Sequence, residues 1–249
     1  MNSTNESPNT FQLDWGTHAA LKLLGDFKFE SLLDIGSGAG EHKRLFDYFK
    51  KQTYSVDIVK SADYCGDFME VEFEQQFDAI WCSHVLEHQR NVGLFLDKIF
   101  HCLKDDGVLA IVVPIHPRER LISGHLTSWS IPLLCYNLIM AGFDCKQASI
   151  LSTYELSLIV RKKLANHSEL RAPSAHGADA GHEFKNIESF FPFQVSQGVN
   201  VNVEGVGAIN WGSPVDYILP TLPEAEAPVI IQSKNLEASP TLSPALTYR

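Results

Sequence analysis

The chain has 249 residues, 45% of them apolar, and a formal net charge of −10 at neutral pH. This length suits one large domain or a smaller domain with an appendage, and the apolar content is enough for a real core. A chain this acidic is a poor candidate for nonspecific nucleic-acid binding, which needs a basic face. We therefore expect a small-molecule partner and no nucleic acid.

Membrane and secretory segments are not predicted. Residues 108–115 form one of the longest apolar runs, well short of the roughly 20 residues of a spanning helix. Residues 1–8 lack the basic and apolar regions of a secretory signal. Five scattered cysteines, an odd number, favour buried thiols over a disulfide framework. We therefore expect a cytoplasmic protein with no membrane span.

The first 28 residues are expected to lie outside the main fold. Residues 1–10 are polar and typical of a disordered segment. Residues 17–24 have the spacing of a short amphipathic helix, which is expected to pack on the fold that follows.

A glycine-rich turn follows the first predicted strand. Residues 31–35 are an apolar run ending near an acid, and glycine then recurs at Gly36, Gly38 and Gly40 before a predicted helix at 41–51. Glycine allows positive φ and a close approach by a ligand, and the free N–H groups at a helix N-terminus attract an anion. The turn therefore predicts a nucleotide-like ligand.

An acidic residue ends the second predicted strand, at 53–59. Asp57 lies about 20 residues beyond the glycine turn, the spacing at which an open α/β sheet places a carboxylate against ribose hydroxyls. The glycines follow the pattern G-x-G-x-G, with Glu41 where a dinucleotide fingerprint would have its third glycine. This departure disfavours NAD as the ligand.

The elements further along alternate between strand and helix. Residues 104–107 predict a turn, and residues 108–114 are apolar throughout, as in a strand buried on both faces. The alternation predicts an α/β fold with a doubly wound parallel sheet that binds its ligand at the carboxyl ends of the strands. The other predicted strands are 62–68, 77–82, 145–151 and 155–163, and the other predicted helices are 93–103 and 130–141.

An ordered set of motifs extends over residues 29–164. These motifs read Leu-Leu-Asp-Ile-Gly-Ser-Gly-Ala-Gly, Val-Asp-Ile-Val, Gly-Asp-Phe, Phe-Asp-Ala-Ile-Trp-Cys-Ser-His-Val-Leu-Glu-His and Leu-Lys-Asp-Asp-Gly-Val-Leu. In order and spacing the set resembles class I S-adenosylmethionine-dependent methyltransferases. The resemblance implies a Rossmann-like, mostly parallel sheet of seven strands with an antiparallel last strand, and S-adenosylmethionine as the cofactor.

The resemblance also implies roles for individual residues. Asp34 and the turn from Gly36 to Gly40, with Ser37, would hold the methionine end of the cofactor. Asp57 would bind the ribose hydroxyls, and Ile58 would pack on the adenine. The cofactor-binding set is completed by Asp67 at the adenine amino group, Phe68 beside the ring, and Ser83 after the fourth strand.

Histidines follow the fourth and fifth strands, where an acceptor would bind. A hydroxyl acceptor must lose a proton, and histidine suits that task near neutral pH. His84 and His88 are therefore candidate general bases. His116 and His125, in the loop after the fifth strand, are further catalytic candidates.

Residues 84–88 also read H-x-x-E-H, an inverted zinc-peptidase pattern. Residues 89–93 interrupt the long helix that such a peptidase needs, and the glycine turn would have no role. A divalent ion that assists methyl transfer through His84, Glu87 and His88 is an open alternative, as in some related quinone-modifying methyltransferases. The sequence assigns no metal ligand.

The remaining chain divides into an extension and a tail. Residues 165–219 are expected to pack on the core or the acceptor site, with an apolar segment at 184–211 that could make a homodimer contact, and residues 220–249 predict a flexible tail. After the core come a Gly-His-Leu-Thr-Ser-Trp-Ser loop, a helix end reading Ala-Gly-Phe-Asp and a Phe-Phe-Pro segment. This arrangement is similar to that of bacterial enzymes of surface-polysaccharide assembly, which implies O-methylation of a sugar or sugar-linked acceptor. The alternatives are a quinone-like or other small-molecule O-methyltransferase and a noncatalytic cofactor-binding activator subunit.

Overall fold

The computed structural model describes residues 9–163, 187–193, 207–212, 219, 229–233 and 245–248. Within these residues the main sheet has eight strands in the order β4-β3-β2-β5-β6-β8-β7-β9. Its strands are β2 (Ser31–Ile35), β3 (Gln52–Asp57), β4 (Tyr64–Cys65), β5 (Phe77–Ser83), β6 (Leu103–Pro114), β7 (Ser149–Ser152), β8 (Glu155–Arg161) and β9 (Gly207–Ile209).

Strand direction confirms the expected fold class. The pairs β2·β3, β3·β4, β2·β5 and β5·β6 are parallel, whereas β8 runs antiparallel to both β6 and β7. The first seven strands in chain order from β2 therefore make the mostly parallel sheet with an antiparallel strand that the resemblance implied. The eighth strand, β9, comes from the predicted extension and pairs with β7.

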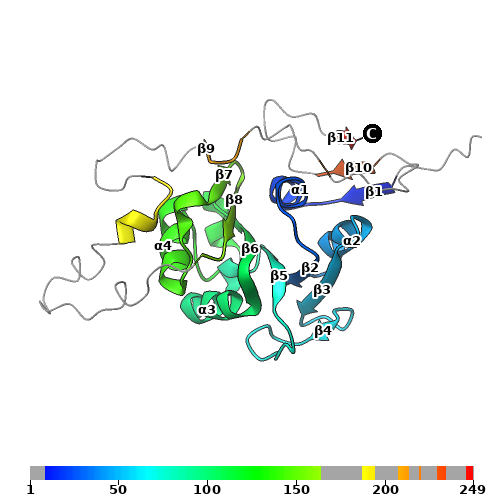
Figure 1. Cartoon of the computed structure of the whole chain (residues 1–249), viewed down its shortest axis with the longest axis horizontal. Coiled ribbons are helices and arrows are strands. Elements are labelled where there is room, and N and C mark those ends of the chain that lie inside the picture. The colour runs from blue at the N-terminus through cyan, green and yellow to red at the C-terminus, as the bar shows by residue number, and fades with distance from the viewer. Residues whose placement is uncertain are drawn as a thin grey trace, which may run out of the picture.

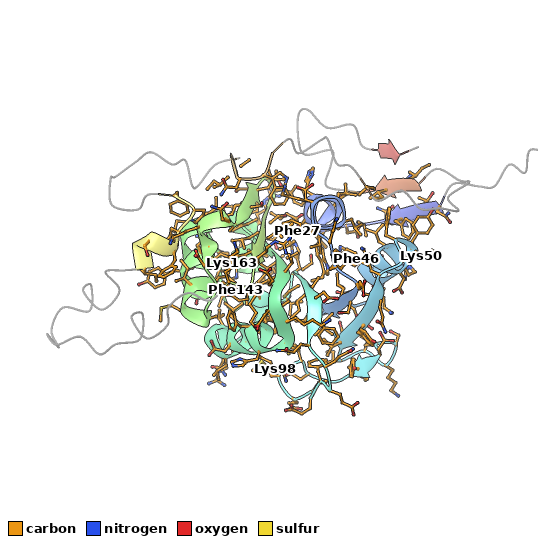
Figure 2. All side chains as sticks on the ribbon, in the orientation of Figure 1. Phe27, Phe46, Lys50, Lys98, Phe143 and Lys163 are labelled. Atoms are coloured by element: carbon orange, nitrogen blue, oxygen red, sulfur yellow. The ribbon has the colours of Figure 1, made fainter. Side chains whose placement is uncertain are left out.

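Two hydrophobic cores lie on opposite faces of this sheet. Neighbouring residues of one strand, such as Leu32 and Leu33, alternate between the cores because successive side chains of a strand point to opposite faces. Figure 1 shows α1 (Thr17–Asp26) and α2 (Glu41–Tyr48) on one side and α3 (Val92–Cys102) and α4 (Ile131–Ala141) on the other. Figure 2 shows Phe46 of α2 and Phe143, which follows α4, within these separate cores.

Three predicted elements differ from the structure in more than their end residues. The third strand is only the two-residue β4, and Cys145–Gln147 form a 3₁₀ turn, η3, before the short β7. The predicted turn at 104–107 lies within the long β6, but the pairing of β6 with β5 is irregular there and Asp106 has φ of 63°. The chain therefore still bends at this point, without leaving the sheet.

A second, three-stranded sheet joins the two ends of the chain. Here β10 (Val229–Gln232) pairs in parallel with β1 (Asn9–Gln12) and antiparallel with β11 (Ala245–Tyr248). Figure 1 places this sheet beside α1 and α2. Segments predicted as a disordered start and a flexible tail thus contain paired strands. Part of the apolar segment at 184–211, including the valines at 199, 201 and 203, lies outside the described residues.

Within the described residues, none of the helices has the length and apolar character needed to cross a lipid bilayer.

Candidate functional site

The glycine turn connects β2 to α2 and is packed on one side only. Gly36 has φ of 72°, and a Cβ there would lie 2.2 Å from Cγ2 of Val85, which follows β5. Gly38 also has positive φ, but a Cβ there would meet no atom within 4 Å. Gly40 precedes α2 with φ of 76° and supplies no side-chain cap, and Ser37 accepts the Gly40 N–H through its carbonyl. The turn is therefore packed against Val85 at Gly36 and has free space beside Gly38.

Asp34 lies beneath this turn and is fully buried near the end of β2. The backbone N–H of Lys43, in the first turn of α2, donates a hydrogen bond to its carboxyl group, while Oδ2 has no partner among the described residues. Burial raises the pKa of Asp34 to about 7, against the opposing charge of Lys43. An unpartnered buried oxygen beneath an open glycine turn fits the polar methionine end of S-adenosylmethionine.

Asp57 joins the end of β3 to the glycine turn. Its carboxylate accepts the backbone N–H of Gly38 at 2.8 Å and that of Val59 at 3.1 Å. Each carboxylate oxygen has a second lone pair that can accept from a ribose hydroxyl. The neighbouring Ile58 is 78% exposed, which leaves an apolar side chain free to contact a flat ring. The roles of Asp57 at the ribose and of Ile58 at the adenine stay predictions with which this geometry is compatible.

The two residues predicted to bind adenine, both after β4, differ in their exposure to solvent. Asp67 is exposed and accepts the backbone N–H of Met69 at 2.8 Å, within its own turn. Phe68 is buried in a core and packs edge to face on Phe95, with ring centroids 5.1 Å apart. The position predicted for Phe68 beside the adenine ring stays a prediction, because Phe68 contacts protein side chains here.

His84 follows β5 and lies between two buried glutamates. Its Nε2 is 3.0 Å from Oε2 of Glu155, and its Nδ1 is 3.3 Å from Oε1 of Glu87. Burial would lower the pKa of His84, but the contacts with Glu155 and Glu87 outweigh it and raise the pKa to about 9. The imidazole is therefore protonated at neutral pH and cannot accept a proton. A protonated imidazole does not suit a general base, and the catalytic role of His84 stays a prediction.

The other three predicted histidines do not share one position. His116 is exposed and its Nδ1 accepts the backbone N–H of Arg118, as the cap of the 3₁₀ turn η2 (Pro117–Leu121). His88, in the 3₁₀ turn η1 (Leu86–His88), and His125 lie together, with ring centroids 4.8 Å apart. The structure therefore brings His88 and His125 into one cluster and leaves His116 outside it.

Ser83 lies against the segment that precedes α1. Its Oγ is buried without a partner among the described residues, and a Cβ on Gly16 would lie 3.1 Å from it. Gly16 has φ of 69°, so any side chain there would meet both strain and a clash with Trp81. Ser83 therefore lies next to Gly16, and no contact among the described residues assigns it to a cofactor.

Trp15 and Glu155 belong to the site although the sequence analysis did not select them. The Trp15 ring is 40% exposed and lies 4.6 Å from the His84 ring. Glu155 accepts the Gly16 N–H at 2.9 Å and the Tyr154 hydroxyl at 3.0 Å. A lone acid opening an apolar strand was the available signal for Glu155. Trp15 carried no comparable signal, because its partners are distant in sequence.

Comparison with known proteins links this geometry to one family. Residues 14–139, half of the chain, match the family described as a methyltransferase domain. A ubiquinone biosynthesis O-methyltransferase of Nitrobacter winogradskyi is 34% identical over an alignment of 95 positions that covers 32% of this chain and 36% of that relative. An (S)-coclaurine N-methyltransferase of Papaver somniferum is 28% identical over 92 residues, which are 37% of this chain and 26% of that relative.

Among solved structures, the chain is similar to a 1,6-didemethyltoxoflavin-N1-methyltransferase of Burkholderia thailandensis, crystallised with bound 1,6-didemethyltoxoflavin and S-adenosylhomocysteine. The TM-score is 0.49 at 19% identity, over 59% of this chain and 79% of that one. The two curated relatives are matched over only about a third of their length or less.

Proposed function

Because the chain belongs to the methyltransferase-domain family, we propose that it transfers a methyl group from S-adenosylmethionine to a hydroxyl group of a small ring-shaped acceptor. One structural observation supports S-adenosylmethionine binding. The open turn at Gly38, the buried unpartnered oxygen of Asp34 and the carboxylate of Asp57 lie around the carboxyl ends of β2 and β3.

These residues suit the different ends of the cofactor. Asp34 and the glycine turn would bind the methionine end, with Gly38 leaving room for it. Asp57 would accept hydrogen bonds from the ribose hydroxyls, and its own bonds to backbone N–H groups already fix its orientation. Ile58 would cover one face of the adenine with its exposed side chain. S-adenosylmethionine supplies an electrophilic methyl group on a sulfonium.

The acceptor is proposed to bind near Trp15 and the chain after β5. Methyl transfer by in-line displacement depends mostly on holding the acceptor oxygen in line with the sulfonium and away from water. The exposed Trp15 ring offers a flat surface for either a sugar face or an aromatic ring. The charged His84 beneath it is held by Glu87 and Glu155 and stabilises this surface without taking the proton.

Two acceptor classes share this chemistry, a sugar hydroxyl and a hydroxyl on an aromatic ring. The resemblance to enzymes of surface-polysaccharide assembly favours the sugar hydroxyl. The Nitrobacter relative, by its name an O-methyltransferase of ubiquinone biosynthesis, supports O-methylation and is compatible with the aromatic alternative. Both classes present a ring hydroxyl to the methyl group, and two panels of acceptors distinguish a sugar from an aromatic ring.

Calorimetric titration with S-adenosylmethionine tests the cofactor half. Asp57→Ala is expected to weaken binding about tenfold or more, because it removes hydrogen bonds to a charged group. Asp105→Ala is the matched control, since that carboxylate is fully exposed in the irregular part of β6, and its affinity should equal wild type. Absence of binding by wild type, or equal affinity in Asp57→Ala, would reject the cofactor site.

The acceptor half is tested by incubating the protein with isotopically labelled S-adenosylmethionine and two panels, nucleotide-linked sugars and hydroxylated aromatic rings. Mass spectrometry then identifies any methylated product and the labelled atom. A methylated product from either panel supports a ring hydroxyl as the acceptor and shows whether it belongs to a sugar or to an aromatic ring. Cofactor binding with no product from either panel, but with methylation once a partner protein is added, would instead favour an activator subunit.

A further inference from the structure

Three side chains at the carboxyl edge of β5 and β6 form a cluster that the proposed methyl transfer does not use. Glu87, His88 and His125 each offer one ligand atom, and these atoms all lie within 4.8 Å of one another. We propose that they bind a divalent transition-metal ion of the zinc type.

Glu87 provides the first argument. It lies in η1 with its side chain fully buried, and neither carboxylate oxygen has a hydrogen-bond partner among the described residues. The Nδ1 atom of His84, 3.3 Å from Oε1, is not aligned for a hydrogen bond. One imidazole, that of His84, faces two buried carboxylates, Glu87 and Glu155, and can balance the charge of only one of them. A cation on the free Oε2 atom of Glu87 would balance the other charge, which is costly to leave buried.

The two imidazoles present free nitrogens beside this carboxylate. The Nδ1 atom of His88 lies 3.0 Å from the carbonyl oxygen of Gly124, which can only accept, so Nδ1 carries the proton and Nε2 keeps its lone pair. The Nδ1 atom of His125 lies 3.8 Å from Oε2 of Glu119. Metal-binding histidines usually have such a carbonyl or carboxylate on the other ring nitrogen.

The backbone holds the two halves of the cluster together. The N–H groups of Leu126 and Thr127 both donate to the Glu87 carbonyl, at 2.7 and 3.2 Å. Gly124, with φ of 92°, turns the chain so that its carbonyl meets His88 and the next residue is His125. The ligands therefore come from two loops that already form one hydrogen-bonded unit, as a preorganised site requires.

The ligand types select the ion. Two imidazoles and one carboxylate suit zinc and similar transition metals, whereas magnesium and calcium prefer oxygen ligands alone. Tetrahedral zinc bonds would bring the ligand atoms to about 3.3 Å from one another. The half-exposed His88 side chain can make this adjustment by rotating, and three protein ligands leave one coordination position open.

The experiment measures metal binding without reference to methyl transfer. The full chain is treated with a chelator, dialysed and titrated with Zn²⁺ alone by calorimetry, and its thermal unfolding is followed with and without the ion. One equivalent is expected to bind and to raise the unfolding temperature. His88→Ala, which changes an exposed side chain, and His125→Asn are each expected to weaken binding at least tenfold.

His116→Gln is the matched control, because this imidazole lies in the same loop but outside the cluster, and its Zn²⁺ affinity should equal wild type. Circular dichroism confirms that each variant is folded. The site is disproved if wild type binds no Zn²⁺, or if folded His88→Ala and His125→Asn bind it as tightly as wild type. Binding of S-adenosylmethionine in the absence of Zn²⁺ tests the cofactor site separately, so the two proposals can fail independently.

Discussion

The imidazole Nε2 of His84 lies 3.0 Å from the Oε2 atom of Glu155, which ties the end of β5 to the first residue of β8. The other oxygen of Glu155 accepts the backbone N–H of Gly16, so the chain before α1 is held at the same point. His84 itself has φ of 54°, and its backbone N–H donates to Val112 of β6. One ion pair thus connects three distant parts of the chain beneath Trp15.

Replacement of His84 is expected to cost stability first. His84→Asn keeps a residue that tolerates positive φ but cannot reach Glu155, so two buried carboxylates lose their cation. We expect a loss of about 3 kcal/mol in the free energy of unfolding, measured with urea. His116→Asn, at an exposed imidazole, should lose far less. Unchanged stability in His84→Asn with abolished turnover would instead restore His84 as a catalytic base.

The two glycines of the turn should respond differently to alanine. Gly36→Ala places Cβ 2.2 Å from Val85, so we expect a large loss in the free energy of unfolding. Gly38→Ala meets no protein atom and should cost only the strain of positive φ, about 1 to 2 kcal/mol. The same Cβ would occupy space proposed for S-adenosylmethionine, so calorimetry should show weakened binding in the folded Gly38→Ala protein. If Gly38→Ala bound S-adenosylmethionine with wild-type affinity, the cofactor would not bind next to Gly38.

Asp34 should make the stability depend on pH. Its pKa is raised from the ordinary 3.8 to about 7 in the folded chain, mainly by burial, so the unfolded chain releases this proton first as the pH rises. The contribution is fully present below about pH 4 and is lost by about pH 7, a decrease of about 4 kcal/mol. Asp34→Asn imitates the neutral acid and should remove this part of the decrease. Parallel urea titrations of both proteins across this range test it, and identical pH profiles would contradict it.

The sequence predicted the parts of the fold whose signals are local. The strand, glycine turn and helix around Gly36 follow from composition within a few residues, and Asp57 follows from a fixed spacing. Contacts across long separations were not accessible in this way. Neither the pairing of His84 with Glu155 nor the approach of His125 to Glu87 has a local signal, because each depends on how β6 and β8 are placed in the sheet.

The segment after residue 220 shows the same limit and supplies a further prediction. Its composition favoured a flexible tail, but Ile231 of β10 is fully buried in the core that contains α1, and β10 pairs with β1 along four residues. Ile231→Ala should therefore cost about 2 to 5 kcal/mol in the free energy of unfolding, as for other buried large-to-small replacements. Ile230→Ala, one residue earlier and only half-buried, is the matched control and should cost clearly less. Both are measured by urea unfolding, with limited proteolysis reporting whether the C-terminal residues become cleavable. If Ile231→Ala were as stable as wild type, β10 would contribute nothing to the fold and the tail would be flexible after all.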